Sequence, residues 1–164
     1  MPIDTPDIIY RLSGGAANAD PNASLGGAKS GTAMPLSIFD DVPSVEAVAG
    51  HVEYRCIYIH NAHATLTMLG TRAWMQENTP SPTTTFDLGV GTSAAGATEQ
   101  TIADEKTAPV DVAFVVSSDY STGIVLGDIL PGEHRAIWIR RTVGAGTTVI
   151  LDTALIRVEC DTNP

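Results

Sequence analysis

The chain has 164 residues, of which 43% are hydrophobic, enough for one domain with its own core. Only 17% are charged, and the net charge of −10 disfavours nucleic acid and anionic membranes as partners. No apolar run approaches the roughly 20 residues of a membrane-spanning helix. The N-terminus lacks the basic and apolar regions of a secretory signal. We therefore expect a protein that folds in the cytoplasm.

The N-terminal part predicts one strand and then a segment of different character. Residues 8–13 have the composition of a short strand. Residues 14–33 are rich in Gly, Ala, Ser and Asn, and Leu25 is their only large apolar residue. Such a segment buries too little surface to order alone, so we expect either disorder or an arm that orders against a neighbour. Its near lack of charge favours the arm. We assign residues 1–35 to a strand and an extended arm, and residues 36–164 to a separate domain.

The rest of the chain has the pattern of strands separated by turns. Residues 36–49, interrupted by Pro43, predict a strand end followed by a loop or a single helical turn. Gly70 lies inside a strand pattern and predicts a bulge or bend. Strands are predicted over residues 52–59, around Gly70, and over 85–90, 110–116, 124–126, 134–143 and 149–160. Turns are predicted at residues 61–64, at 130–133 and, as a hairpin loop between two strands, at 144–147.

These segments predict an all-β fold. About eight strands follow one another at short intervals, β-branched residues dominate them, and residues 91–109 have no amphipathic stripe that would hold a helix. We expect an antiparallel β-sandwich of jelly-roll or immunoglobulin-like kind, with about eight strands and an extended N-terminal arm. Residues 52–59 alternate between an apolar face and a mixed face that also carries Glu53 and Arg55, and they predict a central strand.

Two motifs suggest ligand binding at first sight. Residues 89–94 partly resemble a dinucleotide-binding loop, but no helix or βαβ pattern surrounds them, so we expect a flexible loop. His60 and His63 have a spacing that metal ligands use on a helix. Here they fall on a strand end and a turn, without further ligands. We expect them to be ordinary surface or turn histidines.

The acidic residues and the serines give no clearer site. A calcium loop needs alternating oxygen ligands, and no serine lies in a nucleophile elbow. We therefore expect no enzyme, no catalytic residue, no cofactor and no metal, and we expect a solvated acidic surface at Asp40, Asp41, Glu46 and Glu53.

Cys56 and Cys160 each lie in an apolar, strand-like stretch. Reducing compartments disfavour disulfides, so we expect two buried free thiols. A bridge that ties the last strand to an early one is the alternative.

Residues 134–141 form the one basic stretch in this acidic chain. Arg135, Arg140 and Arg141, together with Arg157, are four of its nine cations. On a strand, Trp138 and Arg140 share one face and Arg135 and Arg141 the other. The stretch is either a half-buried strand whose arginines pair with local carboxylates, or a docking edge for an acidic partner or a neighbouring subunit.

Three stretches together resemble a family of proteins. They are residues 10–28 (YRLSGGAANADPNASLGGA), 53–61 (EYRCIYIHN) and 126–142 (LGDILPGEHRAIWIRRT). The chain resembles small virion structural proteins of tailed bacteriophages and prophages of proteobacteria. The resemblance implies a place in a particle assembled in the bacterial cytoplasm, and it carries over no catalytic residue.

From this resemblance we expect a capsid decoration or cement protein, a homo-oligomer such as a trimer that contacts the major capsid protein. A tail, baseplate or fibre-adaptor protein is the first alternative, and a glycan-binding module for host attachment is the second. Neither nucleic acid nor a membrane is an expected partner. The candidate contact residues are Tyr10, Arg11, Leu12, Leu25, Arg135, Trp138, Arg140 and Arg141.

Overall fold

The computed structural model describes residues 3–146 and 153–162 and contains ten strands and three short helices. The strands are β1 (Ile8–Leu12), β2 (Gly26–Gly27), β3 (His51–Asn61), β4 (Met68–Glu77), β5 (Thr84–Val90), β6 (Glu99–Thr101), β7 (Phe114–Val115), β8 (Ile124–Ile129), β9 (His134–Val143) and β10 (Leu155–Thr162). The helices are η1 (Thr5–Asp7), η2 (Pro21–Ala23) and α1 (Ser44–Ala49). Within the described ranges, none of these helices has the length and apolar character needed to cross a bilayer.

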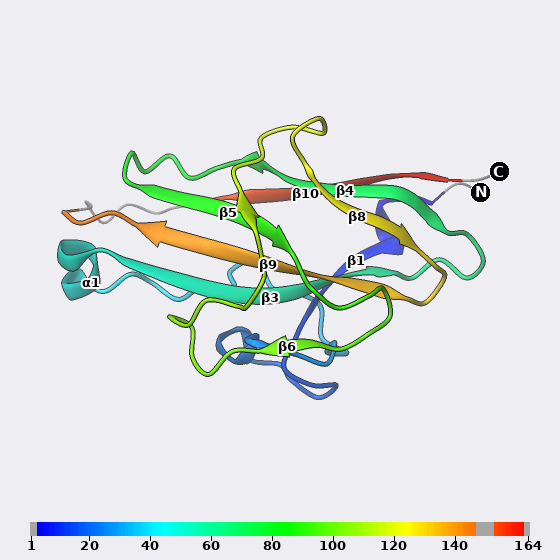
Figure 1. Cartoon of the computed structure of the whole chain (residues 1–164), viewed down its shortest axis with the longest axis horizontal. Helices are drawn as coiled ribbons and strands as arrows, with labels where there is room; N and C mark the ends of the chain where they lie inside the picture. The colour runs from blue at the N-terminus through cyan, green and yellow to red at the C-terminus, as the bar shows by residue number, and fades with distance from the viewer. Residues whose placement is uncertain (1–2, 147–152, 163–164) are drawn as a thin grey trace.

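The strands form two main antiparallel sheets and one small sheet. The larger sheet has the order β1-β3-β9-β5-β7, and the smaller main sheet has the order β10-β4-β8. Figure 1 shows the β10-β4-β8 layer above the layer that contains β3 and β9, while β6 lies below β3. The predicted all-β sandwich is confirmed, with a third layer formed by the β2–β6 pair and the loops around it.

β3 and β9 are inner strands of the larger sheet, and both are largely buried along their length. They pair from His51 opposite Val143 to His60 opposite His134. On the inner face, isoleucines of β3 and β9 pack against the smaller main sheet in a single core. This core joins Ile57, Ile59, Ile137 and Ile139 to Met68, Met75, Leu126, Ile129 and Val158. The predicted central strand is therefore confirmed.

The outer face of the larger sheet is covered by the chain's own loops. The backbone N–H of Cys56 donates to the carbonyl of Ser24 at 2.8 Å, and that of Ile102 donates to the carbonyl of Leu25 at 3.0 Å. A second core forms there from Tyr54, Cys56, Tyr58, Ile102, Ala136 and Trp138. The prediction of an extended or disordered arm over residues 14–33 is thus wrong, since this segment closes on its own sheet.

The N-terminal strand also belongs to the sandwich. β1 pairs with β3 from Ile8 opposite Asn61 to Leu12 opposite Ile57. An isolated bridge joins Arg11 to Ala33, so the end of the 14–33 segment lies alongside β1. Of the predicted arm region 1–35, the described residues 3–35 therefore contribute one strand and one covering segment to the body, rather than a part that extends away from it.

Predictions that depend on only a few neighbouring residues are confirmed. Gly70, at a φ of 56°, accompanies register shifts between β4 and β8, as the predicted bulge requires. α1 forms within residues 36–49, and the turn at 130–133 is present.

Two strand predictions need correction. Only Phe114–Val115 of the predicted 110–116 strand is β7. Of the predicted 149–160 strand, residues 149–152 lie outside the described ranges, and β10 begins at Leu155. The predicted hairpin at 144–147, whose last residue also lies outside them, is wrong because β9 and β10 belong to different sheets.

Candidate functional site

One open side of the sandwich exposes an apolar groove between the edge strands of the two main sheets. β7 is an edge of the larger sheet and β8 an edge of the smaller one. A hollow of about 400 Å³ lies between them and is lined by residues that include Val90, Val115, Ile124 and Val125. Within the part of the chain that the structure describes, no further strand pairs with β7 or β8. We call this hollow the β7–β8 groove.

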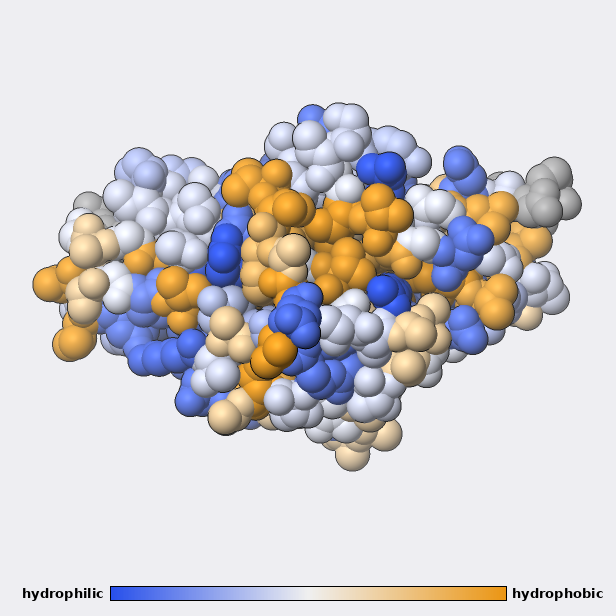
Figure 2. Space-filling model, in the orientation of Figure 1, coloured by the Kyte–Doolittle hydropathy of each residue, from blue (hydrophilic) through white to orange (hydrophobic). Residues whose placement is uncertain are grey.

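Large apolar side chains are exposed around the β7–β8 groove. Val125 is 56% exposed, Val116 is 71% exposed and Val115 is 41% exposed. Figure 2 shows hydrophobic surface across the middle of this face, where Figure 1 places β8. Exposed apolar patches and open sheet edges are the two surface features that most often mark protein–protein contacts.

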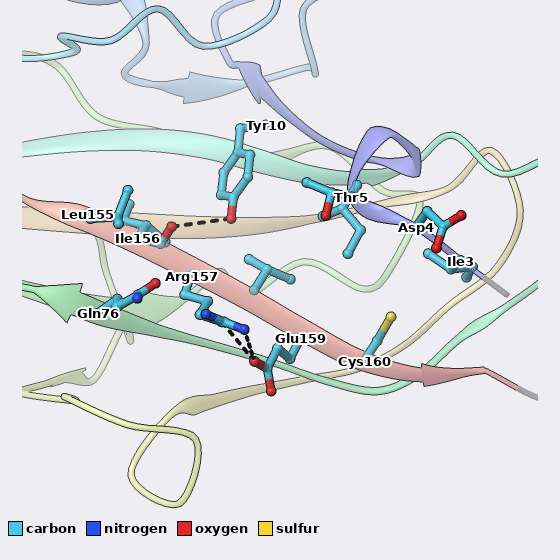
Figure 3. A pocket seen from close by; sticks show the side chains of 12 residues that line it. Ile3, Asp4, Thr5, Tyr10, Gln76, Leu155, Ile156, Arg157, Glu159 and Cys160 are labelled. Atoms are coloured by element: carbon cyan, nitrogen blue, oxygen red, sulfur yellow. Dashed lines mark hydrogen bonds and ion pairs between the residues drawn. The ribbon is translucent and has the colours of Figure 1, made fainter.

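The opposite open side, between β1 and β10, is more polar. A hollow of about 420 Å³ lies there, and Figure 3 shows the side chains that line it. The Tyr10 hydroxyl donates to the carbonyl of Ile156 at 3.3 Å, which ties the two sheets together. Burial raises the pKa of Tyr10 to about 12, so the hydroxyl is a neutral donor at ordinary pH. Arg157 and Glu159 pair with each other at 2.7 Å along the rim. The lining of this hollow is therefore polar in a larger proportion than that of the β7–β8 groove.

The basic stretch is not a docking edge. It forms β9, the third of five strands, which pairs with β3 on one side and β5 on the other. Arg140 donates through Nε to Asp87 at 2.8 Å, and Arg141 donates through Nε to Glu53 at 2.7 Å. Arg135 donates to the carbonyl of Ser93, and Trp138 is fully buried. Arg140 and Arg141 thus pair with carboxylates of their own chain, as the first of the two interpretations of this stretch predicts.

The remaining candidate contact residues also face their own chain. Leu12 is 1% exposed in the inner core, and Tyr10 packs against the same core. Arg11 donates to the carbonyl of Gly31, and half-buried Leu25 packs against the outer core beside Trp138. Tyr10, Leu12, Leu25 and Trp138 therefore belong to the two cores or pack against them, and none of the eight candidates is fully exposed.

A cluster of charged side chains lies at the end of the sandwich where α1 and the start of β3 meet (Figure 1). Phe39 lies at its centre, with the guanidinium carbons of Arg55 and Arg141 at 5.3 and 4.7 Å from the ring centroid. Arg55 is completely buried and Glu53 is 1% exposed. We call this set the α1-end cluster; its ionisable members are Asp40, Glu46, His51, Glu53, Arg55, Glu105, Lys106 and Arg141.

The α1-end cluster changes the interpretation of the acidic residues. Asp40 and Asp41 are exposed, as expected for solvated acids. Glu53, in contrast, is buried in an ion pair with Arg141, and Glu46 pairs with Lys106 at 3.1 Å. These pairs could not be predicted from local patterns, since the partners are 60 to 88 residues apart along the chain.

The two histidines of the suspected metal motif contact main-chain atoms. His60 Nδ1 lies 3.1 Å from the carbonyl of Glu133. His63 Nδ1 accepts from the backbone N–H groups of Thr65 and Leu66 at 3.1 and 2.9 Å. These contacts are those of turn histidines.

The loop that resembles a dinucleotide-binding motif binds a carboxylate of the chain itself. Glu99 accepts from the Thr92 hydroxyl at 3.0 Å and from the Ser93 N–H at 2.9 Å. Burial raises the pKa of Glu99, but these hydrogen bonds outweigh it and lower the pKa to about 2. Sequence reasoning missed Glu99, and the Gly-rich stretch before it was the only signal of a turn that could hold an anion.

Comparisons with known proteins give no assignment for this chain. No family model, no curated protein and no solved structure matches it.

Proposed function

We propose that the chain is a non-catalytic structural subunit of a tailed-bacteriophage virion, a capsid decoration or cement protein that contacts copies of itself and the major capsid protein. The observation that carries the proposal is the β7–β8 groove, an exposed apolar hollow between two open sheet edges. Such a surface suits docking of another protein and lacks the convergent polar groups of a small-molecule site.

The first occupant we assign to the groove is a second copy of the chain. Each copy carries a net charge of −10, so copies repel one another over most of their surface. Of the described residues that line the groove, Asp111 alone is charged. Two copies therefore approach with least repulsion at this place, and burial of the exposed valines favours the contact. Closed symmetry, such as that of a trimer, then repeats the contact.

In a virion, self-association of this kind stabilises the assembled shell. A protein that binds only the assembled, expanded shell stabilises that state by mass action. Weak contacts that are repeated across many copies together give strong binding. The resemblance of residues 10–28, 53–61 and 126–142 to small phage virion proteins supports this setting, and β1, β3 and β9 within them are neighbours in one sheet.

Of the two alternatives, a tail or baseplate role uses the same groove and differs in copy number. A glycan-binding role has less support because sugar platforms need exposed aromatic rings. Trp74 is 6% exposed and Trp138 is fully buried. Tyr120 is 45% exposed, but its ring packs edge-on against Trp74 at 5.9 Å.

Sedimentation equilibrium of the purified chain tests the role of the groove. We expect the wild type to be an oligomer, with a mass near three times the 17.2 kDa of the chain. Val125→Glu places a charge on the groove rim and should yield monomers. Val45→Glu is the matched control, since Val45 is 79% exposed on α1, outside the groove. A monomeric wild type, or an oligomer that Val125→Glu leaves intact, contradicts the proposal.

A further inference from the structure

Three potential metal-ligand atoms converge at the α1-end cluster. His51 Nε2 lies 3.2 Å from Glu53 Oε1 and 3.5 Å from Glu46 Oε2. All three ligand atoms lie within 4.8 Å of one another. Glu46 comes from α1, while His51 and Glu53 come from the start of β3, so the fold itself brings the three together.

Each carboxylate in this trio uses one oxygen for a cationic side chain and presents the other to His51. Glu53 Oε2 accepts from Arg141 Nε at 2.7 Å, and its Oε1 faces the imidazole. Glu46 Oε1 pairs with Lys106 Nζ at 3.1 Å, and its Oε2 faces the imidazole. Outer contacts of this kind fix the orientation of metal ligands.

His51 is the observation that separates this trio from an ordinary ion-pair network. Its side chain is only 8% exposed. Among the residues that the structure describes, neither ring nitrogen has a hydrogen-bond partner, although two carboxylate oxygens lie close to Nε2. Buried polar atoms without a partner are rare and need an explanation. An ion between the imidazole and the two carboxylates supplies one.

We propose that Glu46, His51 and Glu53 form a binding site for a divalent zinc-like ion. Two ligands of a tetrahedral zinc ion, each about 2.1 Å from the metal, lie about 3.4 Å apart. The separations of 3.2 and 3.5 Å around His51 Nε2 match this value. The Glu46 side chain, 25% exposed, is the ligand free to close on the ion, and water fills the fourth position.

The ligand types select the metal. Calcium takes six to eight oxygen ligands and magnesium keeps an oxygen octahedron, whereas zinc accepts one imidazole with carboxylates. The neighbouring trio Asp40, Glu53 and Glu105 is not a second site, because the buried guanidinium of Arg55 already lies 2.5 Å from Glu105 and 3.7 Å from Asp40. An ion at the proposed site would join α1 to the sandwich. This inference does not depend on the proposed virion role.

Isothermal titration of zinc into the full chain, first stripped with a chelator, tests the site. We expect one saturable zinc ion per chain and a rise in the thermal midpoint when zinc is added. Glu46→Gln and His51→Gln keep the side-chain size and should each weaken binding at least tenfold. His60→Gln, which changes a histidine outside the trio, should leave binding unchanged.

Glu46 is partly exposed, so its variant tests the site even if His51→Gln unfolds the chain. The inference is overturned if the wild type shows no saturable zinc binding. It is also overturned if binding survives both Glu46→Gln and His51→Gln, or if millimolar calcium displaces zinc.

Discussion

Glu53 and Arg141 face each other across β3 and β9 and form an ion pair inside the sandwich. Glu53 is 1% exposed and Arg141 is 7% exposed. Arg141 also donates to the carbonyl of Asp40 at 2.9 Å, so the pair holds the chain before α1 against the central strands.

Glu53→Gln should therefore destabilise the fold strongly. Removal of the Glu53 charge leaves buried Arg141 with only the exposed carboxylate of Asp40, 3.9 Å away, and loss of a buried partner typically costs about 3–5 kcal/mol. Urea unfolding in the presence of a chelator measures the change. Glu159→Gln is the matched control, because Glu159 meets Arg157 at the same 2.7 Å on the exposed surface. Surface pairs contribute about 0–1 kcal/mol, so equal losses in the two variants would contradict this account.

Glu99 should make stability depend on pH at the acidic end. Its pKa is about 2 in the folded chain, below its ordinary value of 4.5. The stabilisation is therefore fully present above about pH 4.5 and is lost as the pH falls from 4.5 towards 2. We expect a contribution of about 1–3 kcal/mol after allowance for solvent screening.

Comparison of Glu99→Gln with the wild type isolates this effect. The pKa values of Asp104 and Asp119 are also lowered, chiefly by hydrogen bonds from Thr107 and Ser121 respectively, but both residues remain in the variant and cancel in the difference. Urea unfolding from pH 2.5 to 6 should show a shallower slope for Glu99→Gln. Exposed Glu77→Gln should follow the wild type. Parallel curves for all three proteins would disprove the assignment.

The covering segment over the larger sheet depends on Gly26. Gly26 has a φ of +92°, and a Cβ there would overlap the carbonyl oxygen of Gln100 in β6. Gly15 has a φ of +108° but open space around it, so it is the matched control. Gly15→Ala should cost about 1–2 kcal/mol through the backbone alone, and Gly26→Ala a further 1–3 kcal/mol through the overlap.

Hydrogen exchange locates the effect of Gly26→Ala. The amides of Cys56 and Ile102, which donate to Ser24 and Leu25, should lose protection in Gly26→Ala and keep it in Gly15→Ala. If both variants keep that protection, the segment is held by something other than this close approach.

The two cysteines should react as free thiols at different rates. Cys56 is fully buried on the outer face of the larger sheet, whereas Cys160 is half-buried in β10. Burial raises the pKa of both thiols, so neither is strongly nucleophilic. A disulfide reagent at pH 8 should label one thiol slowly in the folded chain and two after unfolding. Cys160→Ser should remove the native signal, and a chain with no thiol after unfolding would indicate a bridge.

The sheet core was predictable because its signal is local. Residues 52–59 alternate between an apolar face and a mixed face, a pattern that predicts a central strand, and β3 is largely buried along this stretch. Gly70 and the turn at 130–133 likewise depend on backbone preferences of a few residues.

The covering segment and the strand connections were not predictable in this way. Residues 14–33 have Leu25 as their only large apolar side chain, and they are held by main-chain hydrogen bonds that the carbonyls of Ser24 and Leu25 accept, which composition does not reveal. Residues 144–147 have the composition of a hairpin loop. β10 nevertheless pairs with β4, because packing between residues far apart in the sequence decides which strands pair.

The charged sites were missed for a related reason. Arg140 and Arg141 look like surface charges in sequence because their partners, Asp87 and Glu53, lie 53 and 88 residues away. The proximity of Glu46 to His51 and Glu53 was not predicted either, since Glu46 lies on α1 and the other two residues lie on β3. The β7–β8 groove was hidden as well, because two short edge strands from different sheets form it.

Counting the chain in purified virus particles tests the proposed virion role most directly. Quantitative mass spectrometry against the major capsid protein gives the copy number per particle. A decoration protein predicts copies on the order of hundreds, as shell symmetry requires. About three to twelve copies would indicate a tail protein instead. Its complete absence from particles would contradict the virion role itself.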